Sequence, residues 1–410
     1  MEAAAWYSSP SLSSFDTVYS ADSVEFCPQV GYQDILVCGT YQVLEQSTTS
    51  PNILIKPDEV NGEVMQNDQR EVDGDESYQN EMEKRQTERI GRVYLFRVVD
   101  ERLVEIQRIE TSAVLDMKWA PKISDEPLLA IADAKGCITF YSLLPSYQLV
   151  LKDRIQVCEK TTLCLSLDWG PRGLYEGNLI VSLSSGKLER IIGLNGSNWK
   201  LNIWNGHDYE PWIVIFDQHD PHTVWSGGDD LFLKKWDLRD TSHPTFISKR
   251  FPAGITTLSS SPHNRYLAVG SYDGIIRIYQ THPHSPPTFL AELDVGGGIW
   301  RARWFPFPQR KDLILLACMH DGFKVVEFQD SKDLRNGDVE EDSGMGDVEN
   351  VIKDDLEVWK KYGLKIVRRF DQHSSLAYGV DWCRLSPTIE GDNLVASCSF
   401  YDHMLHLWKG

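Results

Sequence analysis

One recurring motif constrains the fold of this chain more than any other feature. It is SGGDDLFLKKWDLR, from Ser226 to Arg239, and it returns in altered form as GSYDGIIRIY (Gly270 to Tyr279) and SCSFYDHMLHLW (Ser397 to Trp408). Each copy has small residues at a strand end, an aspartate in a tight turn, and an alternating apolar strand that closes on an aromatic residue. Because one such sheet cannot bury both of its faces, the motif predicts stacked blades and therefore an all-β propeller.

The repeat pattern divides the chain into seven blades. We therefore predict a single seven-bladed WD-repeat β-propeller over residues 11–410. The segment SLSSFDTVYS (Ser11 to Ser20) is left over at the start, while the chain ends on a third strand at Trp408. We expect the N-terminal segment to supply the outer strand of the seventh blade, because closing the ring in this way removes exposed sheet edges.

Two acidic stretches interrupt the repeats, one in blade 1 (45–89) and one between blades 6 and 7 (330–358). They carry twelve acidic and five basic residues, and eleven and three, which is most of the formal charge of −19. Such polar, charged segments favour disorder, although a short helix is possible around residues 354–363. The remaining ring shows no basic stripe with interleaved aromatic residues, which argues against nucleic-acid binding.

The sequence lacks the patterns that are typical of several classes of protein. It contains no run of roughly 18 apolar residues and no signal-peptide pattern, so we expect a cytoplasmic protein without membrane insertion. The eight cysteines form no CxxC pair, and we expect reduced thiols and no metal site. GxSxG, P-loop, HExxH and GxGxxG patterns are absent. We expect no cofactor, and a monomer.

Two histidines have the spacing of structural residues in this repeat. His207 precedes the turn residue Asp230, and His373 precedes Asp402 in the same way. We expect each imidazole to bond its turn aspartate, which in turn supports the closing tryptophan of the blade. A catalytic role for either histidine is the alternative.

Two other histidines are candidates for chemistry. In ACMHDGFKVV, His320 is aligned with the turn aspartate of the other blades, so it is either a solvated turn residue or a general base. Blade 7 has one residue more before Asp402 than SGGDD has before its last aspartate, which moves Ser399, Tyr401 and His403 toward the rim or the channel mouth. Extra residues of this kind form bulges that are common near functional sites.

Three aromatic residues stand near the starts of inner strands: Trp212 in PWIVIF, Trp300 in GGGIWRARW and Tyr378 in LAYGVDW. The start of an inner strand lies beside the mouth of a propeller channel. These side chains therefore either pack between blades or converge on a ligand.

Several longer phrases together are similar to the diphthine methylesterase family, WD-repeat proteins of diphthamide biosynthesis. They are TSAVLDMKW, SLDW, EPWIVIFD with SGGDD, GSYD, GGGIWRARWFPF, ACMHDGFK, YGVDW and CSFYDHMLHLW, and they cover the ring apart from the acidic stretches. The resemblance implies a carboxylic ester hydrolase that removes the methyl ester of methylated diphthine on elongation factor 2. It also implies that the freed carboxylate is then amidated to diphthamide, and that elongation factor 2 is the partner.

Ester hydrolysis needs a base and an activated nucleophile. His320 and His403 are the best candidates for the base, and the nucleophile is either water or a side chain. The side-chain candidates are Ser399, Cys398 and Cys318. The predicted catalytic set is His320, His403, Ser399 and Asp402.

The implied substrate also carries a trimethylammonium group, which aromatic rings bind by cation–π attraction. The predicted binding residues are Trp212, Trp300, Tyr378 and Tyr401, with Glu210 or Asp229 as the charge partner. A second functional class stays open, namely a non-catalytic scaffold that recruits other proteins for trafficking or to a ligase. His320 and the SCSFYDH turn distinguish the two classes, because a scaffold has no need of them at a channel mouth.

Overall fold

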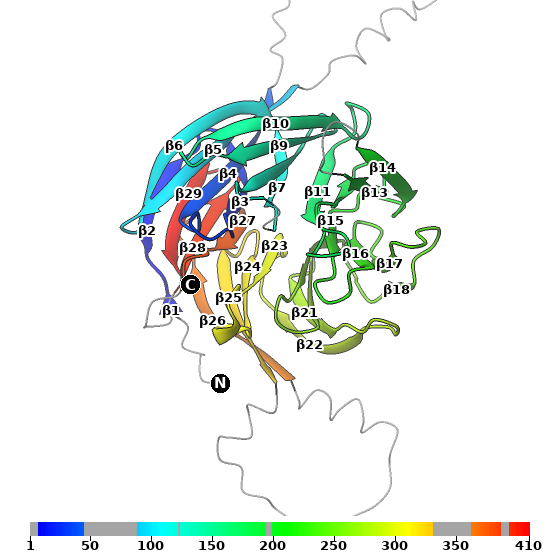
Figure 1. The fold of residues 1–410 in the computed structure, drawn as a ribbon. Helices are drawn as coiled ribbons and strands as arrows, with labels where there is room; N and C mark the ends of the chain where they lie inside the picture. The colour runs from blue at the N-terminus through cyan, green and yellow to red at the C-terminus, as the bar shows by residue number, and fades with distance from the viewer. Residues whose placement is uncertain (1–6, 45–87, 122–123, 194–198, 331–361, 387–392) are drawn as a thin grey trace, which may run out of the picture.

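The computed structural model describes residues 7–44, 88–121, 124–193, 199–330, 362–386 and 393–410. Throughout these ranges the regular elements are strands, apart from the short 3-10 helix η1 (Pro308–Arg310). The strands form seven sheets arranged as a ring (Figure 1). This confirms the predicted seven-bladed β-propeller.

Blades 1 to 3 each use four consecutive strands. Those of blade 1 are β3 (Ser20–Phe26), β4 (Ile35–Leu44), β5 (Glu88–Val99) and β6 (Arg102–Ser112). Those of blade 2 are β7 (Val114–Trp119), β8 (Leu128–Asp133), β9 (Cys137–Leu143) and β10 (Leu149–Gln156). Those of blade 3 are β11 (Cys164–Trp169), β12 (Leu179–Leu183), β13 (Lys187–Ile192) and β14 (Lys200–Asn205).

Blades 4 to 6 repeat this arrangement. Blade 4 has β15 (Ile213–Phe216), β16 (Thr223–Gly227), β17 (Leu233–Asp237) and β18 (Phe246–Ser248). Blade 5 has β19 (Ile255–Ser260), β20 (Tyr266–Ser271), β21 (Ile275–Gln280) and β22 (Thr288–Asp294). Blade 6 has β23 (Arg301–Trp304), β24 (Leu313–Ala317), β25 (Phe323–Asp330) and β26 (Tyr362–Phe370).

Blade 7 joins the two ends of the chain. Its strands β27 (Ala377–Trp382), β28 (Leu394–Ser399) and β29 (Met404–Lys409) are completed by β2 (Ser11–Asp16). β2 pairs antiparallel with β29, from Ser11 opposite Trp408 to Asp16 opposite Met404. The predicted closure is therefore confirmed, although Ser20 already belongs to β3. A short strand that was not predicted, β1 (Tyr7–Ser8), pairs in parallel with β26.

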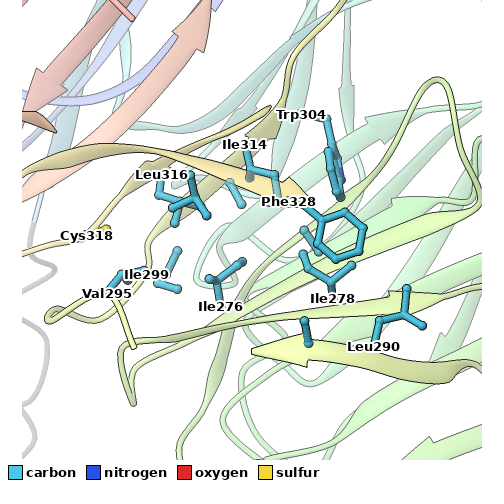
Figure 2. Packing of buried hydrophobic residues seen from close by; sticks show 14 residues of the cluster. Ile276, Ile278, Leu290, Val295, Ile299, Trp304, Ile314, Leu316, Cys318 and Phe328 are labelled. Atoms are coloured by element: carbon cyan, nitrogen blue, oxygen red, sulfur yellow. The ribbon is translucent and has the colours of Figure 1, made fainter. Parts of the chain in front are cut away.

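The apolar core lies between neighbouring blades. Among the described residues there are seven clusters of buried apolar side chains, one at each blade interface. Figure 2 shows the cluster between blades 5 and 6, where Ile276 and Ile278 face Ile314 and Phe328. Because each blade buries both faces against its neighbours, central strands such as β9 are buried along their whole length. The stability of every blade thus depends on the ring being complete.

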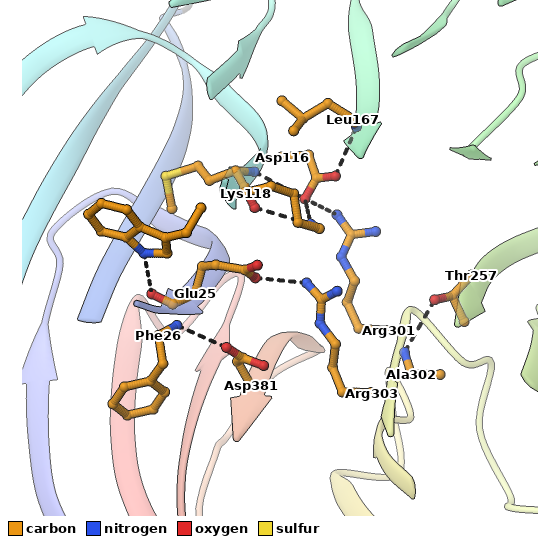
Figure 3. A network of polar contacts seen from close by, with 12 residues as sticks. Glu25, Phe26, Asp116, Lys118, Leu167, Thr257, Arg301, Ala302, Arg303 and Asp381 are labelled. Atoms are coloured by element: carbon orange, nitrogen blue, oxygen red, sulfur yellow. Dashed lines mark hydrogen bonds and ion pairs between the residues drawn. The ribbon is translucent and has the colours of Figure 1, made fainter. Parts of the chain in front are cut away.

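Charged side chains meet in the centre of the ring, where the inner strands adjoin (Figure 3). Arg303 of blade 6 reaches Glu25 of blade 1 at 2.9 Å, and Arg301 lies 3.6 Å from Asp116 of blade 2. Asp116 also binds Lys118 at 2.8 Å. Pairing compensates the desolvation of these charges, and it links blades that are far apart in the chain.

Parts of the predicted organisation lie outside the described residues. This applies to nearly all of the stretch 45–89 and the stretch 330–358, so their disorder stays a prediction. It applies also to most of the possible helix at 354–363, but Tyr362 and Gly363 are described and begin strand β26, so the helix assignment is wrong for these two residues. No helix in the described ranges is long and apolar enough to cross a membrane.

Deleting residues 1–16, which removes β1 and β2, is expected to lower the free energy of unfolding by several kcal/mol and to promote aggregation. The reason is that β29 becomes an unpaired edge. Thermal melting followed by circular dichroism tests this, with deletion of residues 1–6 as the matched control. A melting curve for the longer deletion that overlays the wild-type curve would contradict closure by β2.

Candidate functional site

A chain of buried polar contacts holds blade 4 together. The ring of His207 bonds Asp230 through Nδ1 at 2.8 Å and Ser226 Oγ through Nε2 at 2.7 Å. The indole N–H of Trp236 donates to the same Ser226 Oγ at 2.9 Å. Burial lowers the pKa of His207, although Asp230 opposes this effect. His207 is therefore a structural residue, as predicted, but serine rather than aspartate bonds the tryptophan.

Blade 7 contains the same arrangement. His373 Nε2 lies 3.0 Å from Ser397 Oγ, which also accepts the indole N–H of Trp408 at 3.0 Å. His373 Nδ1 lies 3.5 Å from Asp402. Burial raises the pKa of Asp402, but His373 and the Met404 N–H outweigh this and hold the pKa well below its usual range. The structure thus gives Asp402 a place in this structural chain.

In blade 6 the turn aspartate lies one residue later in the chain than the repeat pattern predicts. Its turn aspartate is Asp321, not His320, because Asp321 pairs with Lys324 and with Arg369 at 2.7 Å. The turn aspartates of blades 4 and 5 form equivalent pairs, Asp230 with Lys234 and Asp273 with Arg277. His320 precedes the turn aspartate, as Asp229 and Tyr272 do in those blades. The interpretation that His320 replaces the turn aspartate is therefore wrong.

A hollow of about 440 Å³ opens beside these turns, between blades 6 and 7. His320 is exposed and lines this hollow, together with His373, Ser374 and Tyr401. The structure therefore brings His320 and Tyr401 together on one surface of the ring.

His403 does not line this hollow. It follows Asp402 in the left-handed backbone region, with φ of +60°, and its carbonyl accepts the Thr17 N–H at 2.9 Å. In blades 5 and 6 the residues after the turn aspartate are Gly274 and Gly322, with φ of +77° and +67°. His403 thus occupies a position where glycine is the unstrained residue.

The predicted side-chain nucleophiles are all buried. Ser399 has no exposed surface, and its Oγ has no hydrogen-bond partner among the described residues. Cys318 and Cys398 are equally buried, and burial raises the pKa of Cys318 to about 12 and that of Cys398 well above its usual range. Because a nucleophile needs a base and access, these groups are poorly placed for attack on a protein-borne ester.

Aromatic rings form a continuous row from blade 4 to blade 7. Trp212 contacts Trp300 with ring centroids 5.7 Å apart, and Trp300 contacts Tyr378 at 4.7 Å. Tyr378 contacts Phe400 at 4.8 Å, and Phe400 contacts Tyr401 at 5.0 Å. We call these five residues the aromatic row. It includes every predicted aromatic residue, and Tyr401 connects it to the hollow.

The sequence patterns did not identify two further aromatic residues at this site, Phe400 and Tyr272. Tyr272 lies beside Trp300 at 6.3 Å between ring centroids. Both missed residues directly follow the small residues at a strand end, in SCSFYD and GSYD, and that shared position was the available signal. The indole N–H of Trp300 is buried without a hydrogen-bond partner in the described structure, so the row keeps one unused donor.

A carboxyl group that the sequence analysis also missed lies at the start of blade 1. Asp22 is 6% exposed and occupies a bulge between Ala21 and Ser23, as Tyr378 does in blade 7 after Ala377. Burial raises the pKa of Asp22 to about 8, while Arg301 lowers it and Asp116 raises it. The available signal was an acidic residue between the small residues Ala21 and Ser23 at the start of the run SADSVEF.

The two predicted charge partners differ in position. Asp229 accepts the indole N–H of Trp212 at 2.8 Å, so it lies at the blade 4 end of the aromatic row. The backbone carbonyl of Glu210 accepts the Asp229 N–H at 3.0 Å, but its side chain makes no ion pair or hydrogen bond within the described ranges. The structure thus favours Asp229 over Glu210.

Metal-type ligands do not gather in the described part of the chain. No group of three or more histidine, cysteine, aspartate or glutamate side chains there could hold a metal ion. All eight cysteines are free thiols.

Comparisons with known proteins identify the repeat and several relatives. The family model "WD domain, G-beta repeat" matches residues 245–280. The chain is 36% identical over 343 residues to a diphthine methyltransferase of Homo sapiens, covering 79% of this chain and 69% of the relative. It is 30% identical over 425 residues to a diphthine methyltransferase homolog of Dictyostelium discoideum, covering 95% and 96%.

A solved structure of a mitotic checkpoint complex contains a chain that superimposes on this one with a TM-score of 0.63. The match covers 100% of this chain and 94% of the other, at 12% identity. At that identity the likeness concerns the fold alone.

Replacing His207 by alanine is expected to lower the free energy of unfolding by about 1–3 kcal/mol, because buried Asp230 and Ser226 lose their partner. Urea denaturation measures this. The matched control is His320→Ala, which is expected to change stability by no more than about 0.5 kcal/mol because the side chain is exposed. Equal stability of the two variants would show that the contacts of His207 do not support blade 4.

Replacing His403 by glycine is expected to leave stability unchanged or to raise it by up to about 1 kcal/mol, because glycine adopts the left-handed conformation without strain. Leu231, with φ of +68° after Asp230, offers a matched control in blade 4. If His403→Gly is destabilised while Leu231→Gly is not, the imidazole makes a stabilising contact in its turn.

Proposed function

The chain belongs to the diphthine methyltransferase family, and from that premise we propose that it acts on the methyl group of diphthine as a carboxylic ester hydrolase. Its substrate is the methyl ester of methylated diphthine on elongation factor 2. The freed carboxylate is then available for amidation to diphthamide. We also propose that the protein acts as a cytoplasmic monomer.

The observation that carries this proposal is the aromatic row, which ends at a hollow containing an exposed histidine. Methylated diphthine has a trimethylammonium group and a methyl ester on the same carbon. An aromatic face attracts such a cation by about 0.5–2 kcal/mol per good contact. A cation held on the row therefore leaves the ester directly beside it, within reach of a neighbouring base.

His320 is the proposed general base. It accepts a proton from water, the water oxygen bonds to the ester carbonyl carbon, and the tetrahedral intermediate expels methoxide, which takes the proton and leaves as methanol. The products are a carboxylic acid and methanol, so the reaction consumes water alone. An exposed imidazole suits this role because both water and the ester can approach its ring nitrogens.

Water is the proposed nucleophile rather than a side chain. Ser399, Cys318 and Cys398 are buried, and no described histidine lies within hydrogen-bond distance of Ser399 Oγ. Asp402 pairs with His373, so we leave it out of the proposed catalytic centre. The centre then consists of His320, with His403 as the alternative base.

Purified protein incubated with elongation factor 2 that carries methylated diphthine is expected to remove one CH₂ unit of mass, seen by mass spectrometry of the modified peptide. His320→Ala is expected to slow this by about 10²-fold or more. The matched control is His243→Ala, another exposed histidine, which lies in blade 4 and should retain full turnover.

Two other outcomes would contradict the proposal. A mass gain of one CH₂ on the unmethylated substrate, seen when a methyl donor is supplied, would reverse the direction of the reaction. Stable binding of elongation factor 2 without any change of mass would favour the non-catalytic scaffold.

A further inference from the structure

We propose that Asp22 is the carboxylate that pairs with a quaternary ammonium group on the aromatic row and gives the site its preference for a cation. The inference rests on the proposed function for the identity of the natural ligand, a trimethylammonium group attached to a protein side chain. The rings of the aromatic row come from blades 4, 6 and 7. The proposal adds a carboxylate from blade 1 to this cation site.

The position of Asp22 follows from closure of the ring. Because β3 lies beside β27, the bulge that holds Asp22 adjoins the bulge that holds Tyr378. A Cβ atom added to Gly379, the residue after Tyr378, would lie 3.0 Å from the carbonyl oxygen of Asp22. Asp22 therefore lies next to the aromatic row at Tyr378, the ring on which a bound cation can sit between blades 6 and 1.

The second argument is charge. The other acidic side chains of the channel have partners: Glu25 pairs with Arg303, Asp116 with Lys118, Asp381 with Arg384, and Asp168 accepts the Phe216 N–H. The side chain of Asp22 makes neither an ion pair nor a hydrogen bond with any described residue, and it is buried. A buried, unpaired carboxylate is unfavourable, so Asp22 favours its protonated form until a cation arrives.

The charged groups around Asp22 support the same conclusion. Arg301 is the nearby cation, but it lies 3.6 Å from Asp116, which opposes its effect on Asp22. The other titratable neighbours, Tyr378 on β27 and Cys398 on β28, are neutral because burial raises the pKa of each. No neighbour therefore supplies Asp22 with a full positive charge of its own.

A pH dependence follows, with a definite sign. Burial raises the pKa of Asp22 to about 8, so below this pH the carboxyl is mainly protonated. A cation binds the ionised form, so binding at neutral pH releases a proton. Affinity for a quaternary ammonium therefore rises as pH increases toward and through 8, and then levels off.

Asp229 is the matched alternative. It lies at the other end of the row, is half-buried, and already accepts the Trp212 indole N–H at 2.8 Å. Its greater contact with solvent screens its charge, so it contributes less to cation binding than Asp22 does. The two carboxylates can be tested by the same substitution.

The experiment uses two small probes of the same shape, choline and its neutral analogue 3,3-dimethylbutan-1-ol, with binding followed by tryptophan fluorescence of the full chain. The wild-type protein is expected to bind choline at least about tenfold more tightly than the neutral analogue. Its affinity for choline is expected to rise between pH 6 and pH 9. Asp22→Asn should lose both the preference and the pH dependence, whereas Asp229→Asn should keep them.

Asp22→Ser is a second variant that tests whether the amide of Asp22→Asn has an effect of its own. It should bind choline as weakly as Asp22→Asn does. Thermal melting verifies the fold of each variant. The proposal is overturned if the wild-type protein does not prefer choline, or if Asp22→Asn keeps the preference and its pH response. Loss of both in Asp229→Asn alone would assign the role to Asp229. Demethylation of elongation factor 2 is measured separately, so failure of the proposed function and failure of this inference are distinguishable.

Discussion

The pairing of β2 with β29 is the interaction on which the rest of the structure depends. It joins residues from opposite ends of the chain, and the cluster between blades 7 and 1, with Phe26, Cys38, Ala396 and Leu405, buries the faces that it brings together. Closure makes the first and last blades neighbours. The bulges of Asp22 and Tyr378 adjoin at this junction of blades 7 and 1, so the proposed cation site depends on the closed ring.

The histidines of this protein have different roles because their surroundings differ. His207 is buried with both ring nitrogens bonded, one to Asp230 and one to Ser226. The buried ring of His373 bonds Ser397 through Nε2, and its Nδ1 lies 3.5 Å from Asp402. His320 is exposed at the rim of the hollow that it shares with His373, so a ligand can reach its ring. The same distinction applies to carboxyl groups, because Asp402 is held by its partners while Asp22 has none.

Much of the fold could be predicted because its signals are local and repeated. The turn aspartates, the closing aromatic residues and the unused segment at the start were enough for seven blades and their closure. The role of His207 followed from spacing for the same reason. His320 and Asp321 are adjacent, and ACMHDGFK alone does not say which one is the turn residue; the ion pairs of Asp321 with Lys324 and Arg369 decide it. Asp22 could not be identified, because its importance depends on contacts across the closure rather than on its neighbours in sequence.

The closing strand also has a consequence for how the protein is made. β2 precedes the strands of blades 1 to 6 in the chain, and its partner β29 follows them. At about 5–20 residues per second, synthesis of the intervening blades takes roughly 20–80 seconds. Throughout that time β2 is an unpaired strand, and the outward face of blade 1 has no blade 7 to cover it. Nascent chains of this protein therefore need protection from aggregation for longer than chains of equal length whose contacts are local.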